Sequence, residues 1–366
     1  MKKLLLASAV AALSVSAANA APTIYGKAFV AADYVNADFD TDVVFPGYAG
    51  NYDEDTVEIN SHASRIGFKG SEAMTANTDV IYQLEYGTSV DGDKNGFTNR
   101  DTFLGVVNKQ FGEFRVGKNQ SSLARIDNVV VNQGYWDNLG TTQYENEVVE
   151  ALNMADSNRI PSSIIWTAPK YNGMPLQLSA MYSSDDANGN DNAGFGVAAM
   201  FDQGTGFTAG LAYDKDQNIA GDIIRGTATV DLGKYMAAPV MLGALYQVAD
   251  YDYAGSEKEK GLVISGEMGL TNFARPASVY AQYNNTDNLA GVNDAKSNQF
   301  VVGGKYMFKD NIIMHAYAGM NKADDINRKL TVKDISAPAG SDKTVDLIYK
   351  GDAEVFVVGT GLEYKF

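Results

Sequence analysis

The sequence has 366 residues, no cysteine, two histidines and a formal net charge of −16 at pH 7. Without cysteine, disulfide scaffolds, thiolate metal sites and cysteine nucleophiles are excluded, and His62 and His315 alone give little support to histidine-based metal sites. We therefore expect no metal and no cofactor. The acidic balance argues against nucleic acid as a partner, because phosphates are bound by clustered Lys and Arg.

Residues 1–20 have the pattern of a secretory signal peptide. Lys2 and Lys3 form a basic start, residues 4–18 are apolar, and Ala18-Asn19-Ala20 fits an A-x-A cleavage site. We expect cleavage before Ala21, which removes the two lysines and takes the net charge from −16 to −18. No later stretch approaches the roughly 20 consecutive apolar residues of a membrane-spanning helix. The sequence therefore predicts an exported protein without a spanning helix.

From residue 22 onward, the chain alternates between unlike faces with a period of two, which is typical of β-strands. Near the C-terminus, Leu362, Tyr364 and Phe366 share one face, while Glu363 and Lys365 share the other. One face suits lipid and the other suits water. The alternating segments are about ten residues long and are separated by clusters of Gly, Asn and Asp, as in outer-membrane barrels.

Aromatic residues at the ends of these segments favour a membrane barrel over a soluble β-sandwich, whose strands also alternate. Tyr246 with Tyr251, and Tyr306 with Phe308, lie where interfacial girdles are expected. The sequence thus predicts an all-β fold, a transmembrane antiparallel barrel with both termini on the periplasmic side. Sixteen strands are expected, near residues 22–35, 56–70, 78–89, 99–110, 112–118, 159–168, 174–184, 193–202, 206–214, 222–232, 238–250, 260–270, 276–285, 297–308, 311–321 and 353–366.

Two connections are too long for simple hairpins. Residues 322–352 are polar and charged, and we expect an extracellular loop there. Residues 119–158 combine apolar residues such as Val129 and Trp136 with acidic ones. A connection of this length usually has a function or is disordered, and its apolar share favours folding against the inner wall of the barrel. The acidic candidates in it are Asp127, Asp137, Glu145 and Glu147.

Five segments share their order and spacing with a known family. They are TIYGK (residues 23–27), SRIGFKG (64–70), QLEY (83–86), FGEFRVGK (111–118) and the terminal GLEYKF (361–366). The first four are similar to the opening strands of general diffusion porins of Gram-negative outer membranes, and the last is similar to their final strand. The middle of the chain resembles the family only in strand length and spacing.

The resemblance implies a homotrimer of sixteen-stranded barrels, each constricted by its third extracellular loop, which corresponds to residues 119–158. It also implies a ladder of basic side chains on the wall, facing acidic groups of this loop. Alternation independently directs Lys27 and Glu85 inward. The loop lacks the Pro-Glu-Phe-Gly tip of the enterobacterial members, so which of its acids faces the ladder stays open. The residues that match the basic ladder are Lys27, Arg65, Arg100 and Arg159.

The resemblance also implies partners. Leu362, Tyr364 and Phe366 match the final strand by which the family is recognised for insertion, so the outer-membrane assembly machinery is an expected partner. Membrane lipid, lipopolysaccharide and small hydrophilic solutes are the others.

Together these features predict an outer-membrane channel for passive diffusion of ions and small hydrophilic solutes, not an enzyme. The loop region 119–158 holds six acidic residues and one basic residue, Arg125, which favours a weak preference for cations. The alternative is a substrate-specific porin for sugars, amino acids or anions, and a more distant one is an outer-membrane enzyme. In the register that points Arg65 inward, His62 is expected to face outward, which argues against catalysis by the cluster around it.

Overall fold

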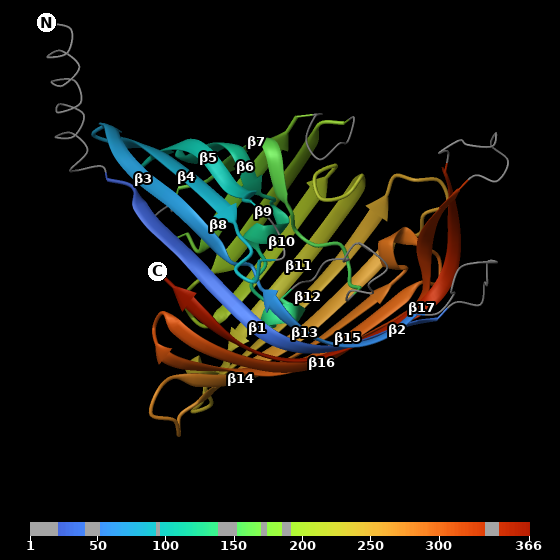
Figure 1. Ribbon diagram of the computed structural model, residues 1–366. Helices are drawn as coiled ribbons and strands as arrows, with labels where there is room; N and C mark the ends of the chain where they lie inside the picture. The colour runs from blue at the N-terminus through green and yellow to red at the C-terminus, as the bar shows by residue number, and fades with distance from the viewer. Residues whose placement is uncertain are drawn as a thin grey trace, which may run out of the picture.

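Seventeen strands make up most of the backbone in the computed structural model, which describes residues 21–40, 52–92, 96–137, 152–169, 174–184, 192–333 and 344–366. The signal peptide expected over residues 1–20 lies outside the described residues. The strands form one antiparallel sheet in which neighbours along the chain pair with each other. The sheet closes into a barrel because β1 pairs with β17 on one side and with β2 and β3 on the other (Figure 1).

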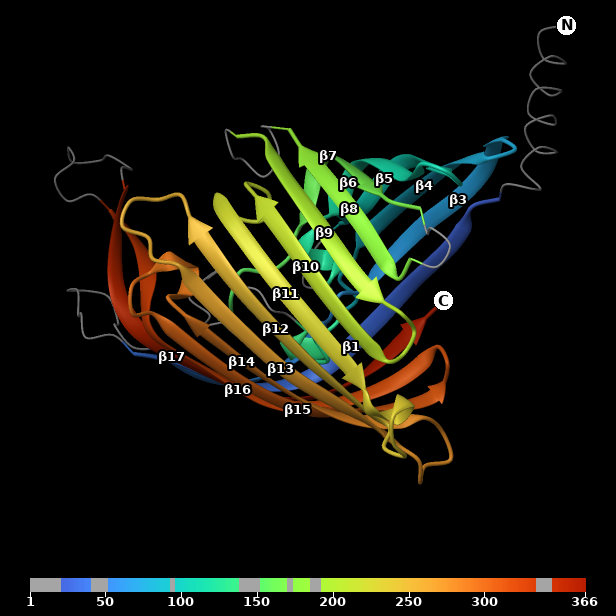
Figure 2. The same ribbon diagram turned by 180° about the vertical axis from the view of Figure 1, so that it is seen from behind.

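The strands lie close to the segments predicted from alternation. Figure 2 shows β8 to β13 side by side in the wall that faces the viewer. Their bounds are β1 (Thr23–Asp40), β2 (Tyr52–Ser61), β3 (Arg65–Thr75), β4 (Thr78–Gly87), β5 (Thr98–Asn108), β6 (Gly112–Gln120), β7 (Arg159–Thr167), β8 (Leu176–Ser183), β9 (Gly194–Asp202), β10 (Phe207–Lys215), β11 (Gly221–Asp231), β12 (Val240–Tyr251), β13 (Glu259–Leu270), β14 (Ala277–Asp287), β15 (Lys296–Lys309), β16 (Ile312–Lys333) and β17 (Thr344–Lys365).

The strands β2 and β3 follow one another at a single strand position of the barrel wall, and we call each such position a stave. Counted in this way, the seventeen strands form sixteen staves, which agrees with the predicted sixteen strands. Both strands pair with β1, in which Val30 lies opposite Ser61 of β2 and Lys27 lies opposite Arg65 of β3. The break falls at residues 62–64, where Ala63 has a left-handed φ of 48°. An even number of staves lets an antiparallel barrel close with every membrane-embedded edge paired.

The break in this stave reverses its alternation, because it inserts one extra residue relative to β1. Even-numbered residues of β2 lie opposite the inward-facing residues of β1, whereas odd-numbered residues of β3 do so. His62 therefore faces the lumen, where its Nε2 lies 2.8 Å from Oδ2 of the fully buried Asp33. The prediction that His62 faces outward is wrong, since it extended the alternation of Arg65 across the break.

The outer surface is apolar where the alternation predicted a lipid-facing side. Ile24, Leu211 and Leu362 are all more than half exposed there, while Glu363, which follows Leu362, is 3% exposed. Aromatic rings gather at the short-turn end, with the ring centroids of Tyr306 and Phe308 4.9 Å apart. Such an aromatic band is typical of the membrane interface.

The pair Tyr246 and Tyr251, predicted to belong to an aromatic girdle, divides between the two faces. Tyr246 is 51% exposed on the outer face, but the Tyr251 hydroxyl donates to Glu259 Oε2 inside the barrel at 3.2 Å. The two residues are an odd number of positions apart, so a regular strand directs them to opposite faces.

The barrel seam is closed at the short-turn end by the last residue of the chain. Gly26 N donates to Phe366 O at 2.8 Å, and Phe366 N donates to Gly26 O at 3.1 Å. The Phe366 ring lies over Gly26, where a Cβ atom would be 2.3 Å from its Cζ. Glycine is required here because the ring occupies the space of a side chain.

Deletion of Phe366 should therefore lower the folded, heat-modifiable fraction of the protein in outer membranes. The deletion removes two backbone hydrogen bonds, which together contribute about 2 kcal/mol, and the ring that covers the seam. Electrophoresis of unheated samples measures the folded fraction. Phe366→Leu is the matched control, because it keeps both backbone bonds and should retain most of the folded protein. An unchanged yield after the deletion would show that the seam does not limit assembly.

The last two strands continue beyond the expected strand ends. The structure pairs Ile326 with Gly351 and Lys333 with Thr344, so much of the predicted extracellular loop 322–352 is a long β16–β17 ladder. The predicted strand ends at 321 and 353 are therefore wrong. Residues 324–333 are largely polar, so they lack the apolar outer face on which the predicted strand ends were based. Two paired strands that extend beyond the membrane into water need no apolar outer face.

The described parts of the connection between β6 and β7 lie inside the ring of strands (Figure 1). These parts, residues 121–137 and 152–158, include the short 3-10 helices η2 (Leu123–Arg125) and η3 (Gly134–Trp136). Inward-facing side chains of the wall hold its backbone: Thr227 Oγ1 donates to Ile126 O at 3.0 Å, and Asn321 Nδ2 donates to Leu152 O at 2.7 Å. The fully buried Trp136 packs on Gly319, where a Cβ would lie 2.7 Å from its Cε2.

Candidate pore constriction

A cluster of arginines and carboxylates lies on the inner wall formed by β3, β4 and β5. Glu85 of β4 accepts from Arg100 Nε at 2.7 Å and lies 3.7 Å from Arg65 Nε. The Tyr25 hydroxyl donates to the second oxygen of Glu85 at 3.0 Å. Three candidate residues from different strands, Arg65, Glu85 and Arg100, are thus in one contact network, with Tyr25 as an additional member.

A β-bulge in β5 points the side chain of Arg100 into the lumen, toward Glu85. Leu84 pairs with Thr102, but Tyr86 pairs with Asn99, so two residues, Arg100 and Asp101, lie opposite Glu85. A bulge of this kind re-aims a side chain and is common near functional sites. Strict alternation from the buried Phe103 would have directed Arg100 outward.

The arginine cluster continues around the wall to β6 and β7. Arg159, a predicted ladder residue, has its Nε 3.5 Å from Asp101 Oδ2, and Arg115 pairs with Glu113. The Arg115 guanidinium also lies over the Phe103 ring, 4.4 Å from its centroid. Asp101, Glu113 and Arg115 were not among the predicted residues, because the family pattern supplied basic residues only at matching positions.

Lys27 lies apart from these ion pairs. It is 9% exposed, and its Nζ lies 5.4 Å from the centroid of the Phe29 ring. Glu363 of β17 and Asp137 after η3 are close enough to attract it electrostatically. Among the described acids of the loop, Asp137 is thus the one that acts electrostatically on Lys27 of the predicted ladder.

The other described acids of the loop, Asp127 and Asp156, lie near the opposite wall and keep side-chain exposures of 21% and 29%. Arg225 of β11 is fully buried, with Asp127 and Asp156 at 3.9 Å and 3.8 Å. Its Nε donates to Gln247 Oε1 at 2.8 Å, and its Nη2 donates to Ala155 O at 3.2 Å. Arg225 was not predicted, although alternation in β11 would have directed it inward beside Thr227. The candidates Glu145 and Glu147 lie outside the described residues.

The site thus has opposed charges on three surfaces: the arginine cluster on β3 to β7, the loop inside the barrel, and Arg225 on β11. A family model described as Gram-negative porin matches residues 7–326. The chain belongs to the Gram-negative porin family. As a member, it is a protein of the outer membrane.

Individual relatives of this porin agree with the family. The major outer membrane protein P.IB of Neisseria gonorrhoeae is 30% identical over 212 residues, which cover 58% of this chain and 56% of the relative. The protein of the same name from Neisseria sicca is 32% identical over 193 residues, covering 52% of this chain and 50% of the relative. The matched region thus spans about half the length of these curated relatives.

Solved structures share the fold of this porin at low sequence identity. An anion-selective porin from Comamonas acidovorans has a TM-score of 0.63 and 16% identity, covering 95% of this chain and 100% of that one. OmpF of Salmonella typhi, in complex with daunomycin, has a TM-score of 0.56 and 18% identity, covering 94% of this chain and 97% of that one.

His62 belongs to a second polar network in the lumen of this porin. Asp33 accepts from the Tyr317 hydroxyl at 2.6 Å and from Asn60 Nδ2 at 2.9 Å, in addition to its contact with His62. These bonds join β1, β2 and β16 next to η3, whose Gly134 packs on the Tyr317 ring. The network satisfies the buried Asp33 carboxylate and supports the wall on which the loop rests.

Neither a membrane-spanning helix nor a metal site is found among the residues that the structure describes. Within the described ranges, no helix of this porin has the length and apolar character needed to cross a membrane. No set of three or more His, Asp or Glu side chains in those ranges has an arrangement that could hold a metal ion.

Proposed function

We propose that this porin forms a water-filled channel through which ions and small hydrophilic solutes diffuse passively across the outer membrane. Residues 119–158 would constrict it, with Lys27, Arg65, Arg100 and Arg159 on one side of the passage and the loop acids on the other. Opposed fixed charges across a narrow aqueous gap orient dipolar solutes and bias the choice of ions.

The main support for this proposal is that charged side chains on one side of the lumen wall are exposed to solvent, whereas those on the opposite side are covered. The side chains of Arg65, Arg100, Arg115 and Arg159 keep relative exposures of 31%, 19%, 27% and 25%. On the opposite wall the loop covers Arg225 and Gln247, which are both fully buried. The open cross-section therefore lies between the arginine cluster and the loop, where a passing solute meets both.

Liposome swelling tests the channel directly. Purified protein in liposomes should admit neutral sugars at rates that fall steeply with solute size, because diffusion through a fixed constriction discriminates by cross-section. Swelling that is fast for one sugar and absent for others of similar size would favour the alternative, a substrate-specific porin. No swelling with any solute would contradict a channel.

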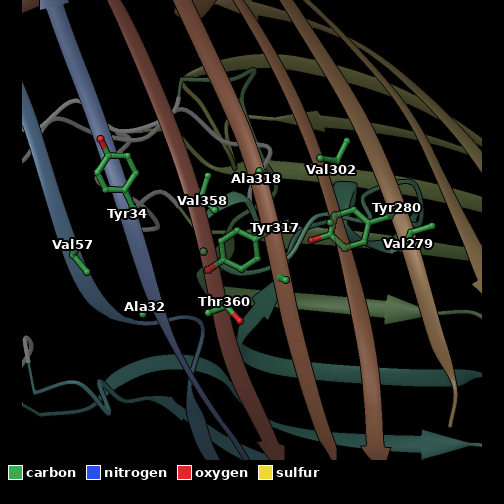
Figure 3. A pocket seen from close by; sticks show the side chains of 13 residues that line it. Ala32, Tyr34, Val57, Val279, Tyr280, Val302, Tyr317, Ala318, Val358 and Thr360 are labelled. Atoms are coloured by element: carbon green, nitrogen blue, oxygen red, sulfur yellow. The ribbon is translucent and has the colours of Figure 1, made fainter. Parts of the chain in front are cut away.

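We also propose a homotrimer. The outer face of β1, β2 and β14 to β17 carries an apolar hollow of about 800 Å³, whose lining includes Ala32, Ala316 and Ala318 between larger residues such as Tyr34 and Val57 (Figure 3). Val57 at its edge is 70% exposed. A large exposed apolar face of this kind suits contact with another subunit or with lipid. Lipopolysaccharide and the outer-membrane assembly machinery, which would recognise Leu362, Tyr364 and Phe366, complete the proposed partners.

The proposal assigns no catalytic role to this chain. His62 contacts Asp33 and Tyr317, whereas the hydroxyl of Ser61 donates to the hydroxyl of Ser64 at 2.9 Å. The cluster thus lacks the serine–histidine contact that activates a nucleophile. The family to which the chain belongs consists of channels.

For ion choice we propose a weak preference for cations, because residues 119–158 hold six acidic residues and one basic residue. Among these acids, Asp127 is half-buried, and burial raises its pKa to about 6, against the opposing effect of Arg225. Asp127 is thus charged at pH 7 and becomes neutral as the pH falls through about 6. Because its pKa is raised in the folded state, acidification does not destabilise the fold through this residue.

Cation preference should therefore decrease when the pH is lowered from 7 to 5. Reversal potentials in planar bilayers under a salt gradient measure the change. In the matched variant Asp127→Asn, the part of the titration centred near pH 6 should vanish, and the preference at pH 7 should already be reduced. A variant that titrates like the wild type would show that Asp127 does not face the passage.

A further inference from the structure

A small niche lies behind η2, between the start of the loop and the lumen wall of β7, β8 and β9. Its volume is about 220 Å³, which corresponds to roughly seven water molecules. The lining residues are Gln120, Ala124, Arg125, Thr167, Gln177, Ser179, Ala198 and Met200. The strand residues come from the half of the barrel near the short turns, so the niche is on the periplasmic side of η2.

Two polar groups of the niche lack a partner in the protein. The Nε of Arg125 is buried without a hydrogen bond, and so is the Oγ of Ser179, a residue that is only 6% exposed. Arg125 also has no carboxylate within ion-pair distance among the described residues, although Glu113 and Asp101 act on it from further away. A buried donor without a partner costs free energy, so these groups favour a ligand that accepts hydrogen bonds.

We propose that this niche binds a small monocarboxylate with a short aliphatic chain. The guanidinium of Arg125 matches a carboxylate in charge and in planar geometry, and the Ser179 hydroxyl supplies a further donor. Ala124, Ala198 and Met200 provide an apolar surface for the chain of the ligand. A single arginine in so small a volume suits one negative charge better than the two of a phosphate ester.

The niche borders the arginine cluster, since Arg115, Glu113 and Asp101 act electrostatically on Arg125, but no ion pair of the constriction among the described residues includes Arg125. Arg65 and Arg100 are engaged by Glu85, and Arg225 is engaged by Asp127 and Asp156. Binding in the niche does not require the channel to conduct, and it is compatible with a weak preference for cations because the positive charge of Arg125 is local. The inference can therefore fail without affecting the proposed function, and the reverse also holds.

Saturation-transfer NMR with butyrate, on the full-length protein in deuterated detergent, tests the niche without measuring transport. Butyrate should give a saturable signal, whereas n-butanol, with a similar chain and no charge, and inorganic phosphate should give much weaker ones. Empty micelles correct for partition into detergent. Equal signals from butyrate and n-butanol would overturn the proposal, as would stronger competition by phosphate than by a second monocarboxylate.

Two variants and one matched control locate the binding. Arg125→Gln should weaken butyrate binding about tenfold or more, since it removes a charge-assisted hydrogen bond, and Ser179→Ala should weaken it by a smaller factor. Lys305→Gln also removes one positive charge but lies outside the niche, and it should leave the affinity unchanged. Heat-modifiability verifies folding of each variant. Equal losses in Arg125→Gln and Lys305→Gln, or no loss in either niche variant, would refute the assignment.

Discussion

Excision of the inner loop should increase single-channel conductance by roughly twofold or more and admit larger solutes, because the narrowest cross-section sets both properties. The structure suggests where to cut. Ser121 N donates to Asn158 O at 3.0 Å, so the two ends of the loop are adjacent. Residues 123–156 can be replaced by a short Gly/Ser linker with the pairing of β6 and β7 left in place.

The point variant Trp136→Ala provides a graded comparison for this excision. Truncating a fully buried tryptophan typically costs about 3–5 kcal/mol, and here the cost falls on the contact between η3 and β16. We expect noisier currents and a conductance between those of the wild type and the excised protein. If excision leaves both the conductance and the exclusion limit unaltered while the barrel folds, residues 119–158 do not constrict the passage.

Neutralising Arg65 and Arg100 together should shift selectivity clearly toward cations. In the Arg65→Gln/Arg100→Gln variant, Glu85 loses both positive neighbours, so the local charge of the three residues changes from one positive to one negative. A unit charge at 4 Å in water is worth about 1 kcal/mol, which corresponds to a roughly fivefold change in local ion concentration. Because salt screens these charges, the shift should be largest at low ionic strength.

Two matched variants make this result specific. The double variant Arg65→Lys/Arg100→Lys keeps both charges and should retain most of the wild-type selectivity, although it loses the fork geometry of arginine. Glu85→Gln leaves two unopposed arginines and should shift the reversal potential in the opposite direction. If the double Gln variant shows no shift at any ionic strength, with folding and trimer content intact, these side chains do not line the passage.

The number of staves and the lipid-facing surface were predictable from the sequence because both depend on a period of two in apolar residues. The breaks were not predictable. An extra residue at 62–64 turns the side chain of His62 to the other face of the wall, and an extra residue in β5 beside Glu85 does the same for Arg100. Neither insertion changes the residue types from which a strand is predicted. Arg100 was assigned inward by family resemblance, and its alternation alone would have given the opposite face.

Charged partners were harder to predict than the fold, because they are brought together from strands far apart in sequence. Arg225 lies about 100 residues beyond Asp127, yet the two side chains are 3.9 Å apart. Alternation in β11 contained enough information to direct Arg225 inward. Alternation could not predict the path of the described loop residues through the lumen, because that path depends on packing contacts such as the one between Trp136 and Gly319.

The current through single molecules in a planar bilayer tests the central claim most directly. Purified wild-type protein should insert with discrete conductance steps, and the step size should rise with the conductivity of the bathing salt, as expected for an aqueous pore. Heat-denatured protein at the same concentration should give no steps. A folded, inserted barrel that passes no current at any applied voltage or salt concentration would contradict the account of this protein as an open diffusion channel.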